Sequence, residues 1–555
     1  MRLNHWAATL VSFLCIGVSH ASSPTLDYLE KVDSAEELAK QGKTSDAVKA
    51  LREALKINGQ DGTLWVRLGE LAYTAKDWDA LLEAADNILS VGAFMNKHKA
   101  ESRYYAAIAY TQKGDLEAGW KSLEAAMAYG YRNLDNIRKN ELLAPLRKNP
   151  GWVELTATHD VKAMSRDEGW RYDIKLLDRE LRRLHYAPYL YVSPAERDKT
   201  IKTLLNQVPK LSNEQIITEI YRYTASFGDG HTAIRMNPVQ RPRLTTFWFE
   251  EGIFITGVAP EHKELLGARI VGVQGDPIAK VLEKMNPLMS GENSQRTLAL
   301  GGNFVTNPVL LKGVGYPIEK GVVDLDVELL DGTRKKVSVP SSDKFQPDAT
   351  WTSADPSPAP DYLKNRSKPY WFSIDAEKKR LYFQYNAVEN AGGEPIPVFA
   401  ARMFKEAEEK GVTQVIVDVR WNGGGNTFLS TPFLKGFIAN PKFSAPGGMY
   451  VIIGRNTYSA AQNFTTDLTR YCAPTFVGEP TGSSPNFIGE SIRFTLPYSG
   501  MNGTVSDLFW QRSWPMDGRN WIPADLPAPP TFKAYRAGID PAMEAINAFE
   551  NRKEM

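Results

Sequence analysis

The sequence predicts a multidomain α/β protein with an N-terminal array of α-helical repeats. Three observations lead to this fold class. The first part of the chain has helical periodicity, interrupted by turn signals about one repeat length apart. The middle part changes to the two-residue alternation of short strands. The last part alternates apolar strands with helices, which is typical of an α/β core with mostly parallel strands. The 555 residues suffice for several such domains.

Residues 1–21 have the pattern of a secretory signal peptide. Arg2 precedes an apolar stretch over residues 6–18, and small residues around Ala21 offer a cleavage site before Ser22. A membrane anchor is the alternative, but the stretch is short for a bilayer-spanning helix. We therefore expect a periplasmic or secreted protein with no membrane span in the mature chain.

The composition narrows the choice of partners and cofactors. The chain is 43% hydrophobic and 24% charged, and its formal net charge is +1, which argues against nucleic acid or an anionic membrane as the main partner. After signal removal Cys472 is the remaining cysteine, so we expect no intrachain disulfide and no cysteine-based zinc site. No His-Glu-x-x-His motif occurs, and no metal or other cofactor is expected; a carboxylate metal site stays open as an alternative.

Residues 22–165 are predicted to form paired helices. Trp65, Gly69 and Tyr73 stand at helix-packing spacing before one turn signal, and Tyr105 and Gly114 continue the pattern in the next unit. This arrangement resembles tetratricopeptide repeats, with an unrelated helical bundle as the alternative. Because stacked helix pairs offer concave surfaces, we expect this region to bind a protein partner or substrate.

The middle of the chain changes character twice. Residues 166–240 are predicted to be a helical subdomain, because leucine and isoleucine recur there with helical period. Residues 241–340 are predicted to be a β-rich subdomain, in which Asp331-Gly332 between two alternating runs indicates a hairpin. Residues 341–369 are rich in proline and are predicted to be a linker.

Residues 370–555 are predicted to form the α/β core. Strands are expected at 381–383, 412–419, 449–453 and 476–478, and helices at 397–410 and 459–471. In such cores ligands bind at the carboxyl ends of the strands. Two polar features fall at these ends, a serine and a glycine-rich loop.

Ser459 is the first of these features, at a strand-to-helix junction. A hydroxyl there meets the unpaired N–H groups and the positive dipole end of the following helix, both of which favour an oxyanion. The alternative is a plain helix N-cap, the commonest role of serine at that place. The second feature, Gly423-Gly424-Gly425, follows the 412–419 strand and can direct backbone N–H groups at a ligand.

Four short motifs occur in order at 228–232, 418–425, 458–461 and 477–482. Together they resemble the C-terminal processing (tail-specific) protease family, on the branch of the tricorn core, over about residues 170–545. The resemblance implies a crotonase-like α/β core with Ser459 as nucleophile. It also implies an oxyanion hole from Gly424 or Gly425 together with Ala460, a helical cap, and a small β subdomain that is PDZ-like. A protein or peptide is the implied substrate.

The resemblance also bears on the base. In the Ser–Lys branch a lysine follows the Gly-Glu-x-Thr motif shortly, but residues 478–486 contain none. The tricorn-like branch uses a histidine from an earlier loop, which here is His231, whose ordinary pKa of about 6.5 suits a base. In that branch a serine precedes the histidine, whereas here Gly230 does. The alternative is that His231 only caps a turn with Asp229.

A third group is expected to orient the imidazole, and the sequence offers Glu490 and Asp517 without choosing between them. The functional hypothesis is an exported serine endopeptidase with a histidine base. The alternative is a catalytically inactive member of the same fold that acts as a ligand-binding or scaffold protein in the cell envelope.

Overall fold

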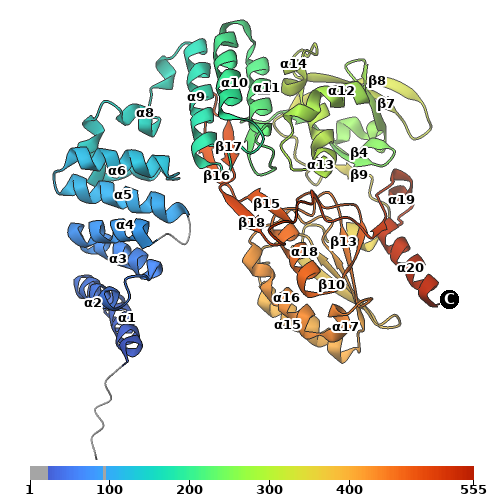
Figure 1. Ribbon diagram of the computed structural model, residues 1–555. Coiled ribbons are helices and arrows are strands. Elements are labelled where there is room, and N and C mark those ends of the chain that lie inside the picture. Colours follow the sequence, from blue (N-terminus) through green and yellow to red (C-terminus); the bar gives the residue numbers. More distant parts are fainter. Residues whose placement is uncertain (1–22, 92–95, 555) are drawn as a thin grey trace, which may run out of the picture. The chain divides into compact units, whose positions relative to one another are not determined.

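The computed structural model describes residues 23–91 and 96–554, so the predicted signal peptide lies outside the described residues. The chain divides into two compact units between His159 and Asp160, whereas the sequence placed this boundary after residue 165 (Figure 1). Within the two described ranges, none of the helices combines the length and the apolar character of a membrane-spanning segment.

The first unit is a set of helical repeats, as predicted (Figure 1, blue). Its helices are α1 (Pro24–Lys40), α2 (Thr44–Ile57), α3 (Gly62–Ala75), α4 (Trp78–Val91), α5 (Asn96–Gln112), α6 (Leu116–Ala128), α7 (Leu134–Lys139), η1 (Glu141–Lys148) and α8 (Trp152–Thr156). One apolar cluster around Leu51, Leu68 and Leu81 lies between the first four helices. A second cluster around Leu123 and Leu143 lies between the later ones, so each helix pair buries its apolar face against a neighbour.

The second unit begins with the predicted helical subdomain. After η2 (Val161–Ala163) it consists of α9 (Arg166–Leu184), α10 (Pro194–Gln207), η3 (Val208–Lys210) and α11 (Asn213–Ala225). All three α-helices begin with a capping box. The hydroxyls of Ser165, Ser193 and Ser212 each accept from the backbone N–H three residues later, and the side chain of that later residue accepts from the backbone N–H of the serine. These local signals fix where each helix starts.

The predicted β-rich subdomain contains an eight-stranded sheet in the order β2-β8-β7-β5-β4-β3, with β6 on β5 and β9 on β4. Its elements are β2 (Arg241–Pro242), β3 (Leu244–Phe249), β4 (Gly252–Val258), η4 (Pro260–Leu265), β5 (Arg269–Val273), β6 (Asp276–Pro277), α12 (Ile278–Met285), η5 (Asn286–Leu288), α13 (Ser294–Val305), α14 (Pro308–Gly313), β7 (Val322–Glu328), β8 (Arg334–Ser342) and β9 (Thr352–Ser353). The predicted hairpin is the β7–β8 pair, which turns through Asp331-Gly332.

The proline-rich segment 341–369 joins this subdomain to the core, but it is packed rather than extended. β9 pairs with β4, and η6 (Asp361–Leu363) buries Tyr362 and Leu363 against Phe249 and Phe532. The segment therefore forms part of the protein interior as well as a connection.

The core is built on a six-stranded sheet in the order β10-β11-β12-β13-β14-β19, parallel from β11 onward. Its strands are β10 (Tyr370–Asp375), β11 (Arg380–Tyr385), β12 (Gln414–Asp418), β13 (Met449–Ile453), β14 (Thr475–Gly478) and β19 (Leu526–Pro527). The helices that accompany it are α15 (Ile396–Glu409), η7 (Thr427–Ser430), α16 (Thr431–Ala439), α17 (Pro441–Ser444), α18 (Ala460–Tyr471), α19 (Phe532–Arg536) and α20 (Pro541–Glu554). This confirms the predicted alternation of strands and helices.

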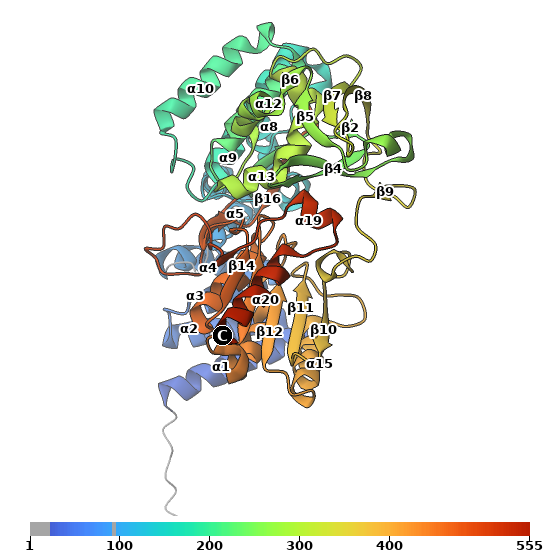
Figure 2. The ribbon, with the colours of Figure 1, turned by 90° about the vertical axis from the view of Figure 1, so that its right-hand side faces the viewer.

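Both faces of this sheet are covered. On one face Phe383, Val417 and Val451 pack against helices that include α15, α16 and α18. On the other face Ile416 and Ile452 pack against α20, which Figure 2 shows lying across the strands. Strands buried on both faces account for the continuous apolar runs in the sequence.

A small separate sheet links the helical subdomain to the core. β1 (Ala233–Arg235) pairs antiparallel with β17 (Asn502–Val505), which also pairs with β16 (Ile492–Thr495). A second pair is formed by β15 (Asn486–Gly489) and β18 (Leu508–Gln511). Because β1 follows directly after His231, its pairing with β17 holds the loop that carries this histidine against the core.

Candidate active site

Ser459 lies in a strained backbone conformation at the start of α18. Its φ is 56° and its ψ is −124°, a region that side-chain-bearing residues rarely occupy and that costs about 1–3 kcal/mol. It holds the N-cap position, but its side chain makes no capping hydrogen bond. The plain N-cap alternative is therefore wrong for the side chain, which leaves the hydroxyl for another partner.

Two loops at the carboxyl ends of β12 and β13 hold Ser459 in place. The N–H of Tyr458 donates to the carbonyl of Asn422 (3.1 Å), and Thr457 Oγ1 donates to the carbonyl of Val419 (3.0 Å). A side chain on Gly424 would put its Cβ only 2.7 Å from Ser459 Cβ, so the glycine loop passes directly beside the serine.

The three candidate oxyanion donors differ in what they already bind. The N–H of Gly424 donates to Asn422 Oδ1 at 2.9 Å. The N–H of Val388 donates to the carbonyl of Gly424, and the carbonyl of Val388 accepts from the N–H of Asn426. The N–H of Gly425 takes part in neither hydrogen bond. Ala460 is the first residue of α18, and the first N–H groups of a helix have no intrahelical acceptor. The N–H of Gly424 is thus already hydrogen-bonded, whereas neither of these bonds uses the N–H of Gly425 and helix geometry leaves that of Ala460 without an intrahelical acceptor.

His231 reaches across from the helical subdomain to the serine. Its Nε2 lies 2.9 Å from Ser459 Oγ, and its Nδ1 lies 2.9 Å from Tyr458 Oη. Burial lowers the pKa of His231 to about 4, the negative charge of Asp229 opposes this shift and the positive charge of Arg296 adds to it. The ring is therefore neutral over most of the pH range, rather than titrating near 6.5 as expected from its ordinary pKa.

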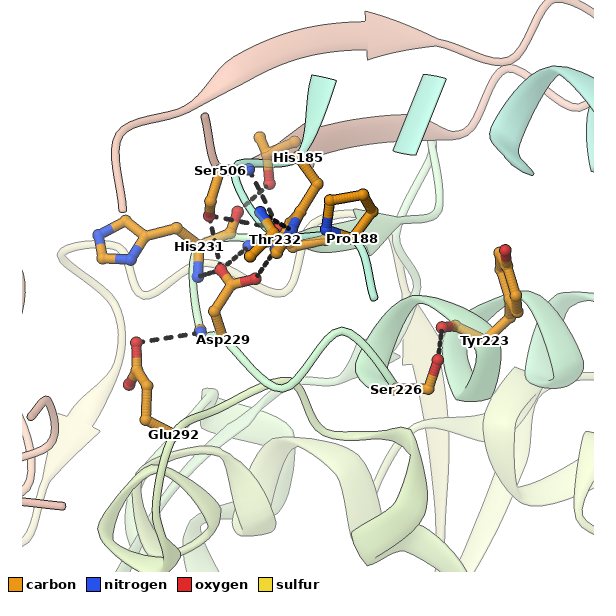
Figure 3. A network of polar contacts seen from close by, with 12 residues as sticks. His185, Pro188, Tyr223, Ser226, Asp229, His231, Thr232, Glu292 and Ser506 are labelled. Atoms are coloured by element: carbon orange, nitrogen blue, oxygen red, sulfur yellow. Dashed lines mark hydrogen bonds and ion pairs between the residues drawn. The ribbon is translucent and has the colours of Figure 1, made fainter. Parts of the chain in front are cut away.

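Asp229 does cap the turn, but through the backbone and not through the ring of His231. Its carboxylate accepts from the N–H groups of His231 (2.9 Å) and Thr232 (2.7 Å), and from the hydroxyl of Ser506 and Nε2 of His185 (2.8 Å). Figure 3 shows these bonds, with the His231 ring pointing away from Asp229. Burial raises the pKa of Asp229, but the hydrogen bond and charge of His185 and the other donors outweigh it and lower the pKa overall. Asp229 is thus a buried anion that fixes the loop.

Neither predicted orienting acid is hydrogen-bonded to His231. Asp517 pairs with Arg519 (2.7 Å) and accepts from Ser513 (2.6 Å), and hydrogen bonding from Arg519 lowers its pKa. Glu490 lies at the exposed end of β15 with a positive φ of 64°. The group at Nδ1 of His231 is Tyr458, which corrects the expectation of a carboxylate there.

Sequence reasoning missed three further residues near the site. Besides Tyr458, these are Glu292, whose Oε1 accepts from the N–H of Gly230 (3.3 Å), and Arg296, whose guanidinium lies 4.5 Å from the centre of the Tyr458 ring. Burial, with the nearby charge of Asp229, raises the pKa of Glu292 to about 8. Tyr458 adjoins Ser459 in its motif and could have been noticed, but nothing local marks the other two.

A cavity of about 500 Å³ opens at the carboxyl ends of β12, β13 and β14, between the core and the β-rich subdomain. Asn456, three residues before Ser459, and Trp421, just before the glycine loop, are part of its wall. Most of the lining is apolar, and its aromatic members are Phe247, Phe249, Trp351, Tyr362, Trp421 and Tyr535.

The charged side chains on the cavity wall are all paired. The pairs are Arg366 with Asp355, Arg420 with Asp540, Arg455 with Glu479, and Asp348 with Arg243. The cavity therefore presents aromatic surface without an unpaired charge and suits an apolar group. Among the residues that the structure describes, no cluster of three metal-binding side chains occurs.

Solved protease structures share this fold. Mature CPAF in complex with lactacystin matches with a TM-score of 0.50 and 11% identity, over 69% of this chain and 97% of that one. The photosystem II C-terminal processing protease (TM-score 0.35, 12% identity, 68% and 96% covered) and the tricorn protease (0.34, 12%, 71% and 37%) also match. No protein-family model matches the sequence, and neither does any curated protein. The chain thus shares the fold of mature CPAF over 69% of its length, and at this identity the likeness extends to the fold alone.

Asp229→Asn is expected to lower the free energy of unfolding by about 2–3 kcal/mol. The N–H of Ala187 donates to Nδ1 of His185 (3.1 Å), so the proton of His185 is on Nε2 and would face the new amide N–H₂ as a second donor. Chemical denaturation measures the change. Asp198→Asn, which removes a 70% exposed carboxylate partner of Arg182 from α10, is the control and should cost no more than about 1 kcal/mol. Equal losses in the two variants would contradict the role given to Asp229.

Proposed function

We propose that this protein is a serine peptidase in which Ser459 is the nucleophile and His231 the base. The observation that carries the proposal is the 2.9 Å contact between Ser459 Oγ and His231 Nε2. These residues are 228 positions apart, and the serine hydroxyl is held away from the helix it would otherwise cap. Nucleophile and base within hydrogen-bond reach are the geometric requirement for acyl transfer.

The proposed reaction has two stages. His231 Nε2 removes the proton from Ser459 as Oγ attacks the peptide carbonyl, and the oxyanion is bound by the N–H groups of Gly425 and Ala460. The intermediate collapses when His231 returns the proton to the leaving amine, and an acyl-enzyme remains. His231 then deprotonates a water molecule that hydrolyses the ester. None of these steps needs a group beyond the chain and water.

The cavity supports a preference for peptides with a large apolar side chain. A volume of about 500 Å³ exceeds that of one aromatic side chain, and the aromatic walls with paired charges favour apolar contacts. Its walls include residues next to both the serine loop and the glycine loop, so a substrate bound at Ser459 can place a neighbouring side chain there.

The second candidate function is that of an inactive protein that binds an apolar ligand in this cavity. The same apolar walls favour it, and the fold alone does not distinguish a peptidase from a binding protein. Reaction with a fluorophosphonate probe separates the two, because only an activated serine is labelled. The helical repeats are compatible with either function, as a surface that binds a protein partner.

Ser459→Ala is expected to abolish both probe labelling and peptide hydrolysis, because it removes the nucleophile. His231→Gln should lower kcat by several orders of magnitude with little change in KM. Labelling is read by mass spectrometry and stability by thermal unfolding, which Ser459→Ala should change by no more than about 1 kcal/mol. Normal hydrolysis by Ser459→Ala would refute the proposed mechanism.

Activity is expected to persist at mildly acidic pH. A base must be neutral, and burial lowers the pKa of His231 to about 4, so kcat/KM should fall only as the pH drops through about 4. The two neighbouring carboxyl groups do not change charge at this pH. The pKa of Asp229 is lowered, so Asp229 is already ionised, and the pKa of Glu292 is raised to about 8, so Glu292 is still protonated. The measurement is kcat/KM against pH, with tryptophan fluorescence to show that the protein is folded at each point. A midpoint between 6 and 7 would show that the free enzyme does not hold His231 buried.

Trp351→Ala is expected to raise KM about tenfold for peptides that place a large aromatic side chain in the cavity. For peptides with alanine at the same position, KM should not change. Trp351 lines the cavity and takes no part in the hydrogen bonds of Ser459 and His231, so the effect separates binding from chemistry. The matched control is Trp514→Ala, whose side chain is 78% exposed. A fluorogenic peptide series that varies one position at a time gives the comparison. An equal effect on all peptides would exclude the cavity as a side-chain pocket.

A further inference from the structure

We propose that Tyr458 is the residue that positions His231, so that a neutral phenol stands where an orienting carboxylate was expected. This inference rests on the proposed function, because it concerns the base of the same reaction. It is carried by three observations: the contact at Nδ1, the absence of space for a side chain at Gly230, and the way in which Tyr458 itself is fixed.

The contact at Nδ1 bears on which ring nitrogen carries the proton, because a phenol can accept from Nδ1–H or donate to a bare Nδ1. For His231 to accept the proton of Ser459, its Nε2 must be unprotonated, so the proton of the neutral ring must be on Nδ1. Tyr458 Oη lies 2.9 Å from Nδ1 and can accept that proton in a hydrogen bond. In the proposed role the phenol is the acceptor of Nδ1–H, which supports the productive tautomer and holds the ring toward Ser459.

Gly230 and Tyr458 fit each other at atomic contact. A Cβ built on Gly230 would lie 2.2 Å from Tyr458 Oη, well inside the closest approach of two such atoms. The backbone of Gly230 lies outside the left-handed region, so its conformation would permit another residue. The tyrosine hydroxyl therefore fills the volume that the side chain of residue 230 would take.

Tyr458 is itself held on several sides. It is only 6% exposed, its N–H donates to Asn422, and the guanidinium of Arg296 lies over its ring. The rings of Tyr458 and His231 are stacked with their centres 4.7 Å apart. A phenol fixed in this way can orient an imidazole without moving to meet it.

A neutral partner has a chemical consequence for the base. Burial raises the pKa of Tyr458 well above 10, so the phenol carries no charge in the range where the enzyme works. It orients His231 but adds no negative charge to stabilise the imidazolium that forms in the reaction. A carboxylate at this place would supply both orientation and charge stabilisation, whereas Tyr458 supplies orientation alone.

The experiment compares four variants for hydrolysis, probe labelling and thermal unfolding. Tyr458→Phe removes only the hydroxyl, and Gly230→Ala pushes the hydroxyl aside. The double variant Gly230→Ser with Tyr458→Phe places a new hydroxyl close to the position that Oη leaves. Tyr471→Phe, an exposed tyrosine on α18, is the matched control for loss of a phenol hydroxyl.

Tyr458→Phe is expected to lower kcat on the order of 10²-fold or more with KM nearly unchanged, because a wrong tautomer affects the chemical step. The double variant should recover at least tenfold of that loss, which a merely structural role of the tyrosine would not explain. Tyr471→Phe should behave as wild type. A Tyr458→Phe variant that is folded and keeps more than half of the wild-type kcat would overturn the inference while leaving the proposed function intact.

Nitrogen NMR of histidine-labelled protein tests the same inference without catalysis. His231 is expected as the Nδ1–H tautomer in the full chain, with a shift at Nδ1 that changes in Tyr458→Phe and returns toward the original value in the double variant. If the wild-type serine is not labelled by the probe but this pattern is seen, the proposed function fails and the positioning role stands. If Nδ1 carries no proton in the full chain, the positioning role fails whatever the activity.

Discussion

The pairing of β1 with β17 is the contact on which the candidate site depends. It joins two segments about 270 residues apart, matching Ala233 with Thr504, and it starts two residues after His231. Thr504 Oγ1 also donates to the carbonyl of His231 (2.7 Å). Ser459 belongs to the α/β core and His231 to the helical subdomain, so this small sheet and the Asp229 network bring the histidine loop to the core, where Tyr458 contacts the ring. The geometry of the candidate site therefore depends on contacts at this junction, which lies apart from the large apolar cores.

The electrostatics of the site follow from its burial. The anion nearest in sequence, Asp229, is directed at backbone N–H groups, Ser506 and His185, and not at the ring of His231. Glu292 is buried with a raised pKa, and Tyr458 stays neutral. Burial is the main cause of the low pKa of the His231 imidazole, the positive charge of Arg296 adds to it, and the negative charge of Asp229 opposes it without cancelling it.

Much of the architecture could be predicted from the sequence, and the reasons are local. Residues 449–453 form a continuous apolar run because β13 is buried on both faces, and the Asp331-Gly332 turn indicated the β7–β8 hairpin. The same apolar run, with a helical pattern after it, predicted the strand-to-helix junction at Ser459. What the sequence could not supply were contacts between distant segments. Nothing in the sequence favoured Glu490, Asp517 or another acid as the partner of the His231 ring. In the structure that partner is Tyr458, which in the sequence resembles an ordinary core aromatic residue. The proline-rich segment was misleading in the same way, because its buried Tyr362 and Leu363 are evident only once the neighbouring β-strands are in place.

The contact between Gly230 and Tyr458 restricts how this chain can change over evolutionary time. A larger residue at position 230 collides with the phenol, and loss of the phenol leaves Nδ1 without a partner unless position 230 gains a hydroxyl. A change at either position disturbs this contact, so the two positions, 228 residues apart in the chain, constrain each other. A glycine before the histidine and a tyrosine before the serine therefore fit as a pair, and a chain that carries both has room for the same packing.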